Sequence, residues 1–502
     1  MCKLIVIDLC LLQAEKQVEQ QAEAEPEQLA DPKEPDDGVP RVLVTGASGY
    51  IATHLIKQLL EQGRFRVRGT VRSLKRDDKV KPLRELVPDA TYPLRLIEAD
   101  LQKPKTWTEA VEGCTYVFHV ASPFPFKAPK NENELIQPAV DGTKNVLQAC
   151  AEAGTVKRVV VTSSVAAVSA GMFGNPGQPE NYVYTEKDWS VEAACAPYEK
   201  SKLKAEQAAW EFVKGLEEGK QFELVVVNPG YVQGPFLSKA SGQSSAQFCV
   251  QLLGNKLIGI PNTSFGIVDV RDVAAAHIAA VEKPEAAGNR YILVGGSLHF
   301  QEIAQIISQE FTPQGYKVPT KQLPKIGLWV AKFFDSTAKM LYPHLGKVIQ
   351  WSNERMKGEL GVHPRPLKET LIDTCYSLIE LGIAKKTLGY LGHPSTRPKP
   401  KEEKPEEGEQ AAEATETPKE PPTEENKDEA KGETETPKEP PTEENKDEAK
   451  GETEAPKELP TEENKDEAKG ETETPKESPT EENKDEAKGE TSTTQPEPEE
   501  GQ

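Results

Sequence analysis

Short runs of β-branched residues alternate with helical stretches from about residue 40 onward, and this alternation constrains the fold more than any other feature. The first run, RVLVTG, begins at Arg41 and precedes a stretch with Ile51, Leu55 and Leu59 on one helical face. Later runs of the same kind are FRVRGTVR, YPLRLIEAD, TYVFHVAS, VKRVVVTSS and FELVVVNPG. Helical stretches are predicted between them, notably around Val140 to Ala153 and Pro197 to Lys214, and a further one beyond them at DVRDVAAAHIAAVEK. Because adjacent parallel strands require long crossover connections, usually helices, this order predicts an α/β fold with a doubly wound parallel sheet.

Composition divides the chain into four predicted parts. Residues 1–39 form an N-terminal segment that we expect to be disordered; from about Gln13 to Gly38 it is rich in Gln, Glu, Ala and Pro, which is typical of a linker or a weak polar helix. Residues 40–234 hold the alternating pattern and should form a Rossmann-type nucleotide-binding domain. Residues 235–393 are less regular and should form a smaller, mostly helical substrate domain, with segments that return to the first domain. Residues 394–502 are an acidic tail.

The tail contains four copies of a 19-residue block, the first reading TPKEPPTEENKDEAKGETE from Thr417. Acids outnumber lysines by four, four, four and three in successive blocks, so the repeats carry 15 of the 21 formal negative charges. Each block lacks the apolar face that stacked repeats must bury to offset backbone entropy. We therefore expect the tail to be disordered, and we leave it as a candidate binding site for unidentified proteins.

Charge and cysteine usage argue against several classes of protein. The folded part has no basic stripe of the kind that binds DNA or RNA. The seven cysteines are widely spaced and form no CxxC pair, so we expect no disulfide framework, no metal site and a reducing, cytoplasmic location. No uncharged apolar run reaches the roughly 18 residues of a membrane span. Asp8 interrupts the apolar start of the chain, which argues against a signal peptide.

A glycine-rich turn, TGASGYIA, lies between the first predicted strand and the first predicted helix. Its small residues are spaced three apart, which lets backbone N–H groups and a helix N-terminus approach a pyrophosphate. Ala52 stands where a third glycine is usual, and its methyl group should affect only the packing of helix on sheet. The alternative is a helix-capping turn without a ligand. We predict a dinucleotide site formed by Gly46, Ser48, Gly49, Tyr50 and Ile51.

The end of the second predicted strand indicates which dinucleotide is bound. An acid there would bind the ribose 2′-hydroxyl of NAD, whereas this sequence reads TVRSLKRDDK. Arg72, with Lys75 or Arg76 behind it, supplies charge-assisted donors for a 2′-phosphate, which favours NADP(H). The alternative is a solvated cationic loop, and Asp77 and Asp78 lie close by in the sequence.

A tyrosine and a lysine, Tyr198 and Lys202, lie four residues apart and therefore on one helical face. A neighbouring ammonium group is expected to lower the tyrosine pKa and make the phenol a proton donor to a carbonyl near neutral pH. Ser163 and Ser164 end the run VVVTSS, where ligands bind in open α/β sheets, and the Ser164 hydroxyl can donate to a substrate oxygen. Taken singly, the Tyr-x-x-x-Lys spacing also arises by chance, and a serine also caps strand ends.

The ordered set of motifs resembles the extended short-chain dehydrogenase/reductases of the NAD-dependent epimerase/dehydratase superfamily, most closely the dihydroflavonol-4-reductase-like branch of carbonyl reductases. The resemblance covers about Pro40 to His393, and its elements are TGASGYIA, TVRS, EADL, FHVASPF, VVVTSSVAAV, PYEKSKLKAEQAAWEF, NPGYVQGP and VDVRDVAAAH. It implies a catalytic set of Ser164, Tyr198 and Lys202, in which the lysine also holds the nicotinamide ribose. It further implies cofactor contacts at Asp100 and Leu101 (adenine), Val120, Ala121 and Ser122 (nicotinamide-side ribose), and Pro229 and Val232 (nicotinamide).

Together these features predict an NADPH-dependent oxidoreductase that reduces an aldehyde or ketone. The apolar residues near the motifs predict an apolar small-molecule substrate, and they are Phe124, Phe126, Met172, Phe173 and Tyr231. One alternative is a sugar-nucleotide epimerase or dehydratase, or a hydroxysteroid dehydrogenase, although Val165 and Ala166 stand where such dehydratases usually place acids. Another is an NADP-binding sensor or scaffold without turnover, although Tyr198 and Lys202 are both present.

Overall fold

The computed structural model describes residues 37–123, 131–170, 174–241, 245–333, 342 and 345–397. The chain divides into two units, Met1–Pro405 and Glu406–Gln502, and all the described residues belong to the first. The predictions for residues 1–36 and for the acidic repeats therefore fall outside the described residues.

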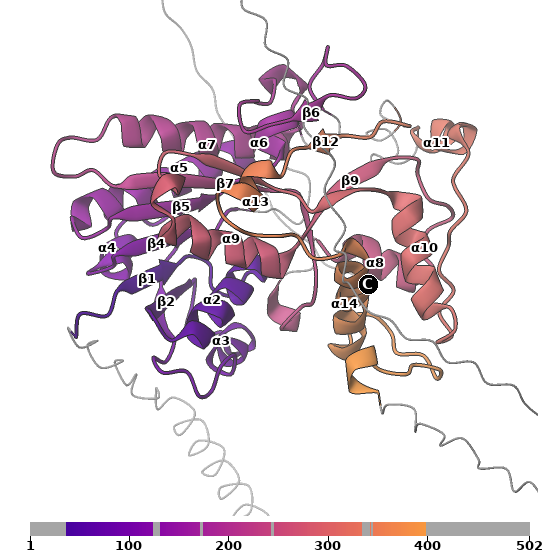
Figure 1. The fold of residues 1–502 in the computed structure, drawn as a ribbon, viewed down its shortest axis with the longest axis horizontal. Helices are drawn as coiled ribbons and strands as arrows, with labels where there is room; N and C mark the ends of the chain where they lie inside the picture. Colours follow the sequence, from indigo (N-terminus) through magenta and orange to yellow (C-terminus); the bar gives the residue numbers. More distant parts are fainter. Residues whose placement is uncertain are drawn as a thin grey trace, which may run out of the picture. The chain divides into compact units, whose positions relative to one another are not determined.

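Seven parallel strands form the central sheet, in the order β10-β7-β5-β4-β1-β2-β3 (Figure 1). They are β1 (Arg41–Val44), β2 (Arg66–Val71), β3 (Arg95–Glu98), β4 (Tyr116–His119), β5 (Arg158–Thr162), β7 (Glu223–Pro229) and β10 (Arg290–Leu293). The chain moves from β1 outward to β3 on one side, and from β4 outward to β10 on the other. Ligands bind at such a switch between neighbouring strands, here β1 and β4. The predicted fold class is confirmed.

Helices cover both faces of the central sheet. The helices on one face are α2 (Tyr50–Gln62), α3 (Asp77–Arg84) and α9 (Val270–Glu282). Those on the other face are α4 (Thr106–Val111), α5 (Asn133–Ala153) and α7 (Pro197–Lys214). The bounds of α7 match the prediction, whereas α5 begins before its predicted start at Val140 because Leu135 and Ala139 extend its buried face.

Two elements beyond residue 234 return to the central sheet. β10 pairs with β7, with Arg290 opposite Val226. α9 packs against α2, and its Val273 and Ala276 lie in the core shared with β1. The sequence analysis recognised α9 as a helix but missed β10, because RYIL lies beyond residue 234, where the regular alternation of strands and helices stops.

A second core forms beyond β7. Its sheet has the order β11-β9-β8, with bounds β8 (Tyr231–Gln233), β9 (Ser264–Asp269) and β11 (Gly296–His299). Its helices are α8 (Gln247–Leu253), α10 (Phe300–Phe311) and α14 (Leu367–Glu380). The expectation of a mostly helical region overlooked this sheet, because its strands are short and two of them contain glycine, Gly266 and Gly296.

The remaining elements are short. They are α6 (Ala166–Ser169), α11 (Lys325–Ala331), α13 (Glu354–Gly358), β6 (Val183–Tyr184), β12 (Gln350–Trp351), and the 3₁₀ turns Glu192–Ala194, Lys239–Ser241, Pro284–Ala286 and Pro394–Thr396.

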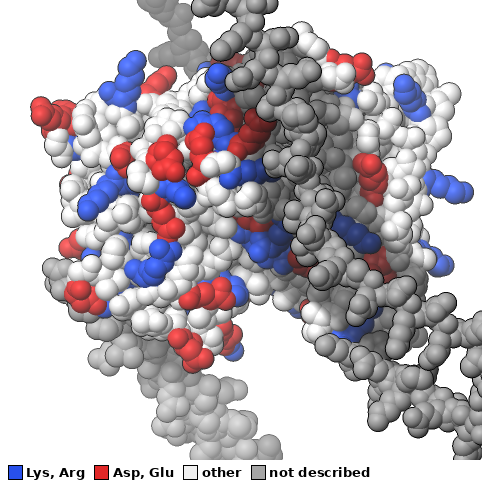
Figure 2. All heavy atoms as spheres, viewed as in Figure 1, with Lys and Arg blue, Asp and Glu red and all other residues white. Residues whose placement is uncertain are grey.

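Tertiary contacts continue past residue 393, since the Arg397 guanidinium lies 3.1 Å from a Glu310 carboxylate oxygen. Figure 2 shows acidic and basic side chains interspersed on one face of the folded part. Within the described ranges, no helix combines the length and the apolar character needed to cross a bilayer.

Candidate active site

The glycine-rich turn occupies residues 45–49, between the end of β1 and the start of α2. Gly46 has a φ of +67°, and a Cβ there would lie 3.0 Å from the Cβ of Ala121, so this position requires glycine. Gly49 precedes α2 and has no side chain to cover the N–H groups of the first turn, which lack intrahelical acceptors. The turn therefore fits a pyrophosphate, which backbone N–H groups and the positive end of the helix would hold.

The other predicted cofactor contacts in and after this turn are Ser48, Tyr50 and Ile51. Ser48 is half-buried within it. The Tyr50 hydroxyl donates to the Gly234 carbonyl oxygen at 2.7 Å, and the Tyr50 ring stacks on Phe236 with centroids 4.1 Å apart. Ile51 packs against the core of this face. Because the side chains of Tyr50 and Ile51 are used in packing, these two residues present only backbone N–H groups to an anion.

The predicted ribose segment, Val120 to Ser122, follows β4 directly and lies against the glycine-rich turn. The Thr45 hydroxyl accepts from the Ala121 N–H at 2.9 Å and lies 3.1 Å from Nδ1 of His119. Burial and, to a smaller extent, the charge of Lys202 lower the pKa of His119 to about 3, so the imidazole is neutral. All three residues of the segment are half-buried. The segment thus borders the switch between β1 and β4.

The cations that should select NADP(H) differ in their surroundings. Arg72 is exposed immediately after β2. Arg76 instead forms an ion pair with Asp78 at 2.8 Å, so its charge is partly neutralised within its own loop. Lys79, which sequence analysis did not single out, is half-buried, and its ammonium group donates to the Ala240 carbonyl oxygen. Burial lowers the pKa of Lys79, and the charge of Arg72 contributes to this shift.

Asp100 and Leu101, the predicted adenine contacts, follow β3 next to the end of β2. The Asp100 carboxylate accepts from the Gln102 N–H at 3.0 Å, and its backbone carbonyl accepts from the Trp107 indole at 3.0 Å. Leu101 packs against Gly142 of α5, where an added Cβ would lie 3.0 Å from Leu101. Both residues are therefore fixed at the carboxyl edge of the sheet.

The two serines after β5 have different surroundings. Ser163 is buried, and its hydroxyl donates to the Glu206 carboxylate at 2.6 Å. Ser164 is half-buried, and its side chain hydrogen-bonds the Tyr198 side chain. Ser164 also accepts from the Ala166 N–H at 3.1 Å. The structure therefore brings Ser164, and not Ser163, together with Tyr198.

Tyr198 lies in the first turn of α7, where local sequence fixes the start of the helix. Pro197 occupies the first helical position, which suits its fixed φ and missing N–H. The Glu199 carboxylate accepts from the Ala196 N–H at 2.9 Å and caps the same turn. One turn further, the Lys202 ammonium group lies 6.0 Å from the centre of the Tyr198 ring. The three predicted catalytic side chains thus converge from β5 and α7.

The predicted direction of the Tyr198 pKa shift is wrong for this geometry. Burial raises the pKa of Tyr198 to about 12 and outweighs the opposing effect of the hydrogen bond with Ser164. The Lys202 ammonium group, 6.0 Å from the centre of the ring, does not outweigh this effect of burial. Burial lowers the pKa of Lys202 to about 8, while the charge of Glu206 raises it. Tyr198 is therefore protonated at neutral pH and able to donate.

The last predicted cofactor contacts, Pro229 and Val232, lie where β7 leads into β8. Pro229 is buried at the end of β7, and its carbonyl accepts from the Val165 N–H at 3.0 Å. Val232 is buried in β8. Pro229 lies beside Ser164, because the Ser164 hydroxyl is 3.5 Å from the Pro229 carbonyl oxygen.

The substrate side of the site is only partly described. Phe124, Phe126, Met172 and Phe173 lie outside the described residues. Tyr231 is described, and its hydroxyl donates to the Ser245 carbonyl oxygen at 2.5 Å while its ring stacks on Phe265 at 4.4 Å between centroids. Tyr231 therefore also serves the packing of the second core.

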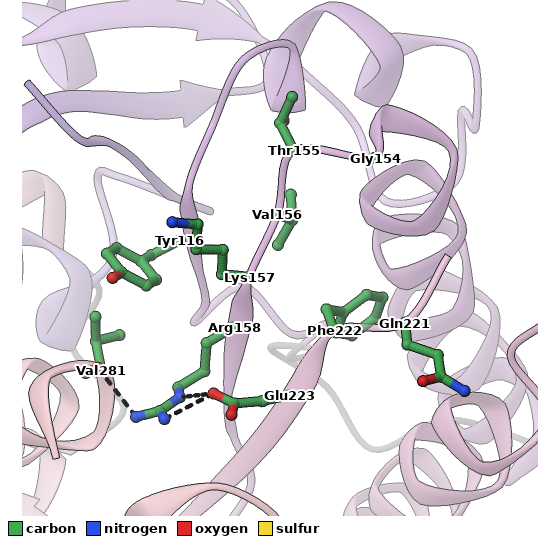
Figure 3. A pocket seen from close by; sticks show the side chains of 10 residues that line it. All are labelled: Tyr116, Gly154, Thr155, Val156, Lys157, Arg158, Gln221, Phe222, Glu223 and Val281. Carbon is green, nitrogen blue, oxygen red and sulfur yellow. Dashed lines mark hydrogen bonds and ion pairs between the residues drawn. The ribbon is translucent and has the colours of Figure 1, made fainter. Parts of the chain in front are cut away.

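A surface hollow of about 620 Å³ lies at the opposite edge of the sheet (Figure 3). Its lining includes Tyr116 and Arg158, which begin β4 and β5, and Glu223, which begins β7. Arg158 pairs there with Glu223 at 2.7 Å and also donates to carbonyl oxygens at the end of α9, including Val281. Because ligands of such sheets bind at the carboxyl ends of strands, this hollow is not the candidate site.

Sequence reasoning missed the residues behind the candidate catalytic side chains. Glu206, Asn228 and Arg290 form a buried polar group that is joined by the hydrogen bonds of the Glu206 carboxylate. For Glu206 the sequence did contain one signal, because this residue shares a helical face with Tyr198 and Lys202. Among the described residues, His, Cys, Asp and Glu side chains form no cluster of three that could bind a metal ion.

The chain was compared with protein families, curated proteins and solved structures. A model described as the NAD dependent epimerase/dehydratase family matches residues 42–295. Cinnamoyl-CoA reductase CAD2 of Medicago truncatula is 38% identical over 348 residues, which cover 68% of this chain and 97% of that protein. Cinnamoyl-CoA reductase 1 of Petunia hybrida is 40% identical over 345 residues, which cover 68% of this chain and 92% of that protein.

Solved structures give the same result. The crystal structure of yeast methylglyoxal/isovaleraldehyde reductase Gre2 complexed with NADPH matches with a TM-score of 0.56 and 29% sequence identity, covering 68% of this chain and 99% of that chain. The region matched by the family model contains the glycine-rich turn and the side chains of Ser164, Tyr198 and Lys202. This chain therefore belongs to the NAD dependent epimerase/dehydratase family, the extended short-chain dehydrogenase/reductases that its motifs predicted.

Proposed function

We propose that this chain is an NADPH-dependent oxidoreductase that reduces an aldehyde or ketone, with Tyr198 as the proton donor. The observation that carries the proposal is the hydrogen bond between Tyr198 and Ser164 at the carboxyl edge of the sheet. If a substrate carbonyl oxygen displaced the hydrogen bond between them, the hydroxyls of Ser164 and Tyr198 could both donate to that oxygen. The similar yeast protein Gre2 is named a methylglyoxal/isovaleraldehyde reductase, and its structure is complexed with NADPH. This similarity supports a carbonyl substrate for the present chain as well.

The residues present fit NADP(H). The turn at Gly46 and the N-terminus of α2 would hold the pyrophosphate, and Arg72 with Lys79 would face the 2′-phosphate. The Lys202 ammonium group would hold the nicotinamide ribose. When bound, NADPH supplies the hydride for the reaction.

The side chains of the chain itself handle the proton. Tyr198, whose pKa is raised to about 12, keeps its proton until negative charge develops on the substrate oxygen, and then releases it to that oxygen. Ser164 donates to the same oxygen and stabilises the developing charge. Lys202 stabilises the phenolate that Tyr198 becomes, because an ammonium group nearby favours the anion.

The two alternatives from the sequence receive no specific support in the site. The residues after Ser164, Val165 and Ala166, are buried and apolar, which leaves no acid where a dehydratase would place one. A cofactor-binding sensor would not need the Ser164–Tyr198 hydrogen bond. An apolar small molecule remains our proposal for the substrate class.

The test is the variant Tyr198→Phe, assayed for carbonyl-dependent oxidation of NADPH over aromatic, aliphatic and steroid carbonyls. We expect kcat to fall by roughly 10²- to 10⁴-fold while NADPH still binds. The matched control is Tyr116→Phe, because Tyr116 lies at the opposite edge of the sheet (Figure 3). Full activity in Tyr198→Phe would refute the mechanism. Tight NADPH binding by the natural chain with no turnover of any carbonyl would favour the sensor.

A further inference from the structure

Behind the candidate catalytic side chains lies a buried carboxylate, that of Glu206 of α7. Its side chain is fully buried. One carboxylate oxygen accepts from the Ser163 hydroxyl at 2.6 Å and from the Asn228 amide at 2.8 Å. The other accepts from the Arg290 guanidinium at 2.6 Å. Ser163 directly follows β5, whereas Asn228 and Arg290 lie in β7 and β10. These three strands are neighbours in the sheet, so Glu206 joins α7 to all three.

Each partner of Glu206 is adjacent to a group that the proposed reaction uses. Ser163 directly precedes Ser164 in the chain. The Asn228 amide also donates to the backbone carbonyl of Ser164 at 3.1 Å. On α7, Lys202 lies one turn before Glu206 and Tyr198 lies two turns before it. The carboxylate therefore contacts the backbone segment that carries Ser164 and the helix that carries Tyr198.

Arg290 makes this anchor rigid. Its guanidinium donates to the carbonyl oxygens of Glu186 at 2.9 Å and Asp188 at 2.7 Å. It also stacks over the Trp189 ring, 3.8 Å from its centre. A guanidinium held on several sides fixes the position of the carboxylate that it binds. Glu206 consequently has one well-defined place relative to the sheet.

We propose that Glu206 is a positioning residue of the reaction: it sets α7 against β5 so that Tyr198 meets Ser164, and its charge keeps Lys202 protonated. This inference rests on the proposed function. The charged and titratable groups described around Lys202 are Tyr198 and Glu206 on α7 and His119 on β4. The phenol and the imidazole are neutral at pH 7, which leaves the carboxylate as the counter-charge.

The expected effect on Lys202 has a definite sign. The charge of Glu206 raises the pKa of Lys202, and burial has lowered that pKa to about 8. Removing the negative charge, and leaving the Arg290 cation without its partner, should lower the pKa of Lys202 further. Lys202 would then lose its proton at a lower pH, and the alkaline limb of the kcat profile would move down with it.

The test compares Glu206→Gln with Glu211→Gln, the same substitution at an exposed position of the same helix. We expect kcat of Glu206→Gln to fall at least about 10-fold with the KM for NADPH little changed, and its alkaline limb to move down by at least about half a pH unit. In the cofactor-free protein, acetylation of Lys202 by acetic anhydride can be followed across pH by peptide mass spectrometry. The pH at which Lys202 becomes reactive should also move down in Glu206→Gln. Glu211→Gln should match the natural chain in kcat, in the KM for NADPH, in the alkaline limb and in acetylation.

Two further variants keep the inference open to refutation. Glu206→Asp keeps the charge but shortens the side chain, so we expect a natural pH profile with a reduced kcat. If Glu206→Gln does not fold, Ser163→Ala removes one hydrogen bond and no charge, and should lower kcat at least about 3-fold. Unchanged kcat and pH dependence in the folded Glu206→Gln, or unchanged kcat in Ser163→Ala when it must stand in, would overturn the role of Glu206. Full activity in Tyr198→Phe would instead refute the proposed function, while acetylation of Lys202 would still report on Glu206.

Discussion

Glu199 should make the protein less stable as the pH rises. This residue caps the first turn of α7 and is 8% exposed. Burial raises the pKa of its carboxyl to about 7 from an ordinary value of 4.5, although the hydrogen bond from the Ala196 N–H lowers it. The folded protein therefore binds a proton that the unfolded chain releases between these two pH values. The contribution of Glu199 to stability is full below about pH 4.5 and is lost as the pH rises through 7.

The variant Glu199→Gln converts this shift into a measurable free energy. One pKa unit corresponds to about 1.4 kcal/mol, so the shift from 4.5 to about 7 amounts to about 3 kcal/mol. Glutamine keeps an oxygen that can accept from Ala196 and carries no charge to desolvate. We expect the variant to be more stable than the natural chain by up to about 3 kcal/mol at pH 8, and within about 1 kcal/mol of it at pH 5.

Urea unfolding at pH 5 and pH 8 measures this difference, provided that the transition is reversible. The control is again Glu211→Gln, which should change the unfolding midpoint equally little at both pH values because Glu211 is exposed. The reasoning is refuted if Glu199→Gln and the natural chain unfold at the same urea concentration at pH 8. A stabilisation of equal size at pH 5 would refute it too, because it would not arise from desolvation of a carboxylate.

Three further predictions concern the cofactor, the opposite edge of the sheet and the tail. Arg72→Glu should lower the ratio of kcat/KM for NADPH to kcat/KM for NADH by about 10- to 100-fold. An unchanged ratio would show that Arg72 does not bind the 2′-phosphate. Arg158→Met should lower the free energy of unfolding by about 2–4 kcal/mol in urea titrations with kcat unchanged, because it leaves the last carbonyls of α9 without donors. Deleting residues 398–502 should leave kcat/KM and the melting temperature unchanged, and a large loss of either would assign the tail a structural role.

The sequence predicted the fold where strands and helices alternate regularly. Six of the sheet strands were found because they lie within this alternation and because runs such as VVV in β5 are apolar, as a strand buried on both faces must be. The helix α7 was placed at its true bounds because Pro197 starts it and its apolar face is continuous. The strand β10 and the small sheet of β8, β9 and β11 were missed, because they lie where the regular alternation stops.

The candidate site shows a different limit. Residues held by local spacing, such as Gly46 beside α2 and Tyr198 before Lys202, could be named because neighbours in sequence are neighbours in space. Glu206 and Arg290 could not be paired, because the two residues lie 84 positions apart and meet only when β10 joins the sheet. Ser164 was chosen over Ser163 through the family resemblance, whereas the physical reason needed the structure, since adjacent residues point to opposite sides and the sequence does not say which side α7 covers.

The error in the Tyr198 pKa is informative about how the proton is held. Sequence spacing identified the ammonium group but gave no measure of burial, and burial has the larger effect on the phenol. A phenol with a pKa of about 12 is a weak base and a fully populated acid at neutral pH, which is the form that reduction of a carbonyl consumes. Oxidation of an alcohol would require the phenolate, which burial disfavours at neutral pH. In the proposed reaction, Tyr198 therefore donates its proton first, and Lys202 with its counter-charge Glu206 would then stabilise the phenolate that remains.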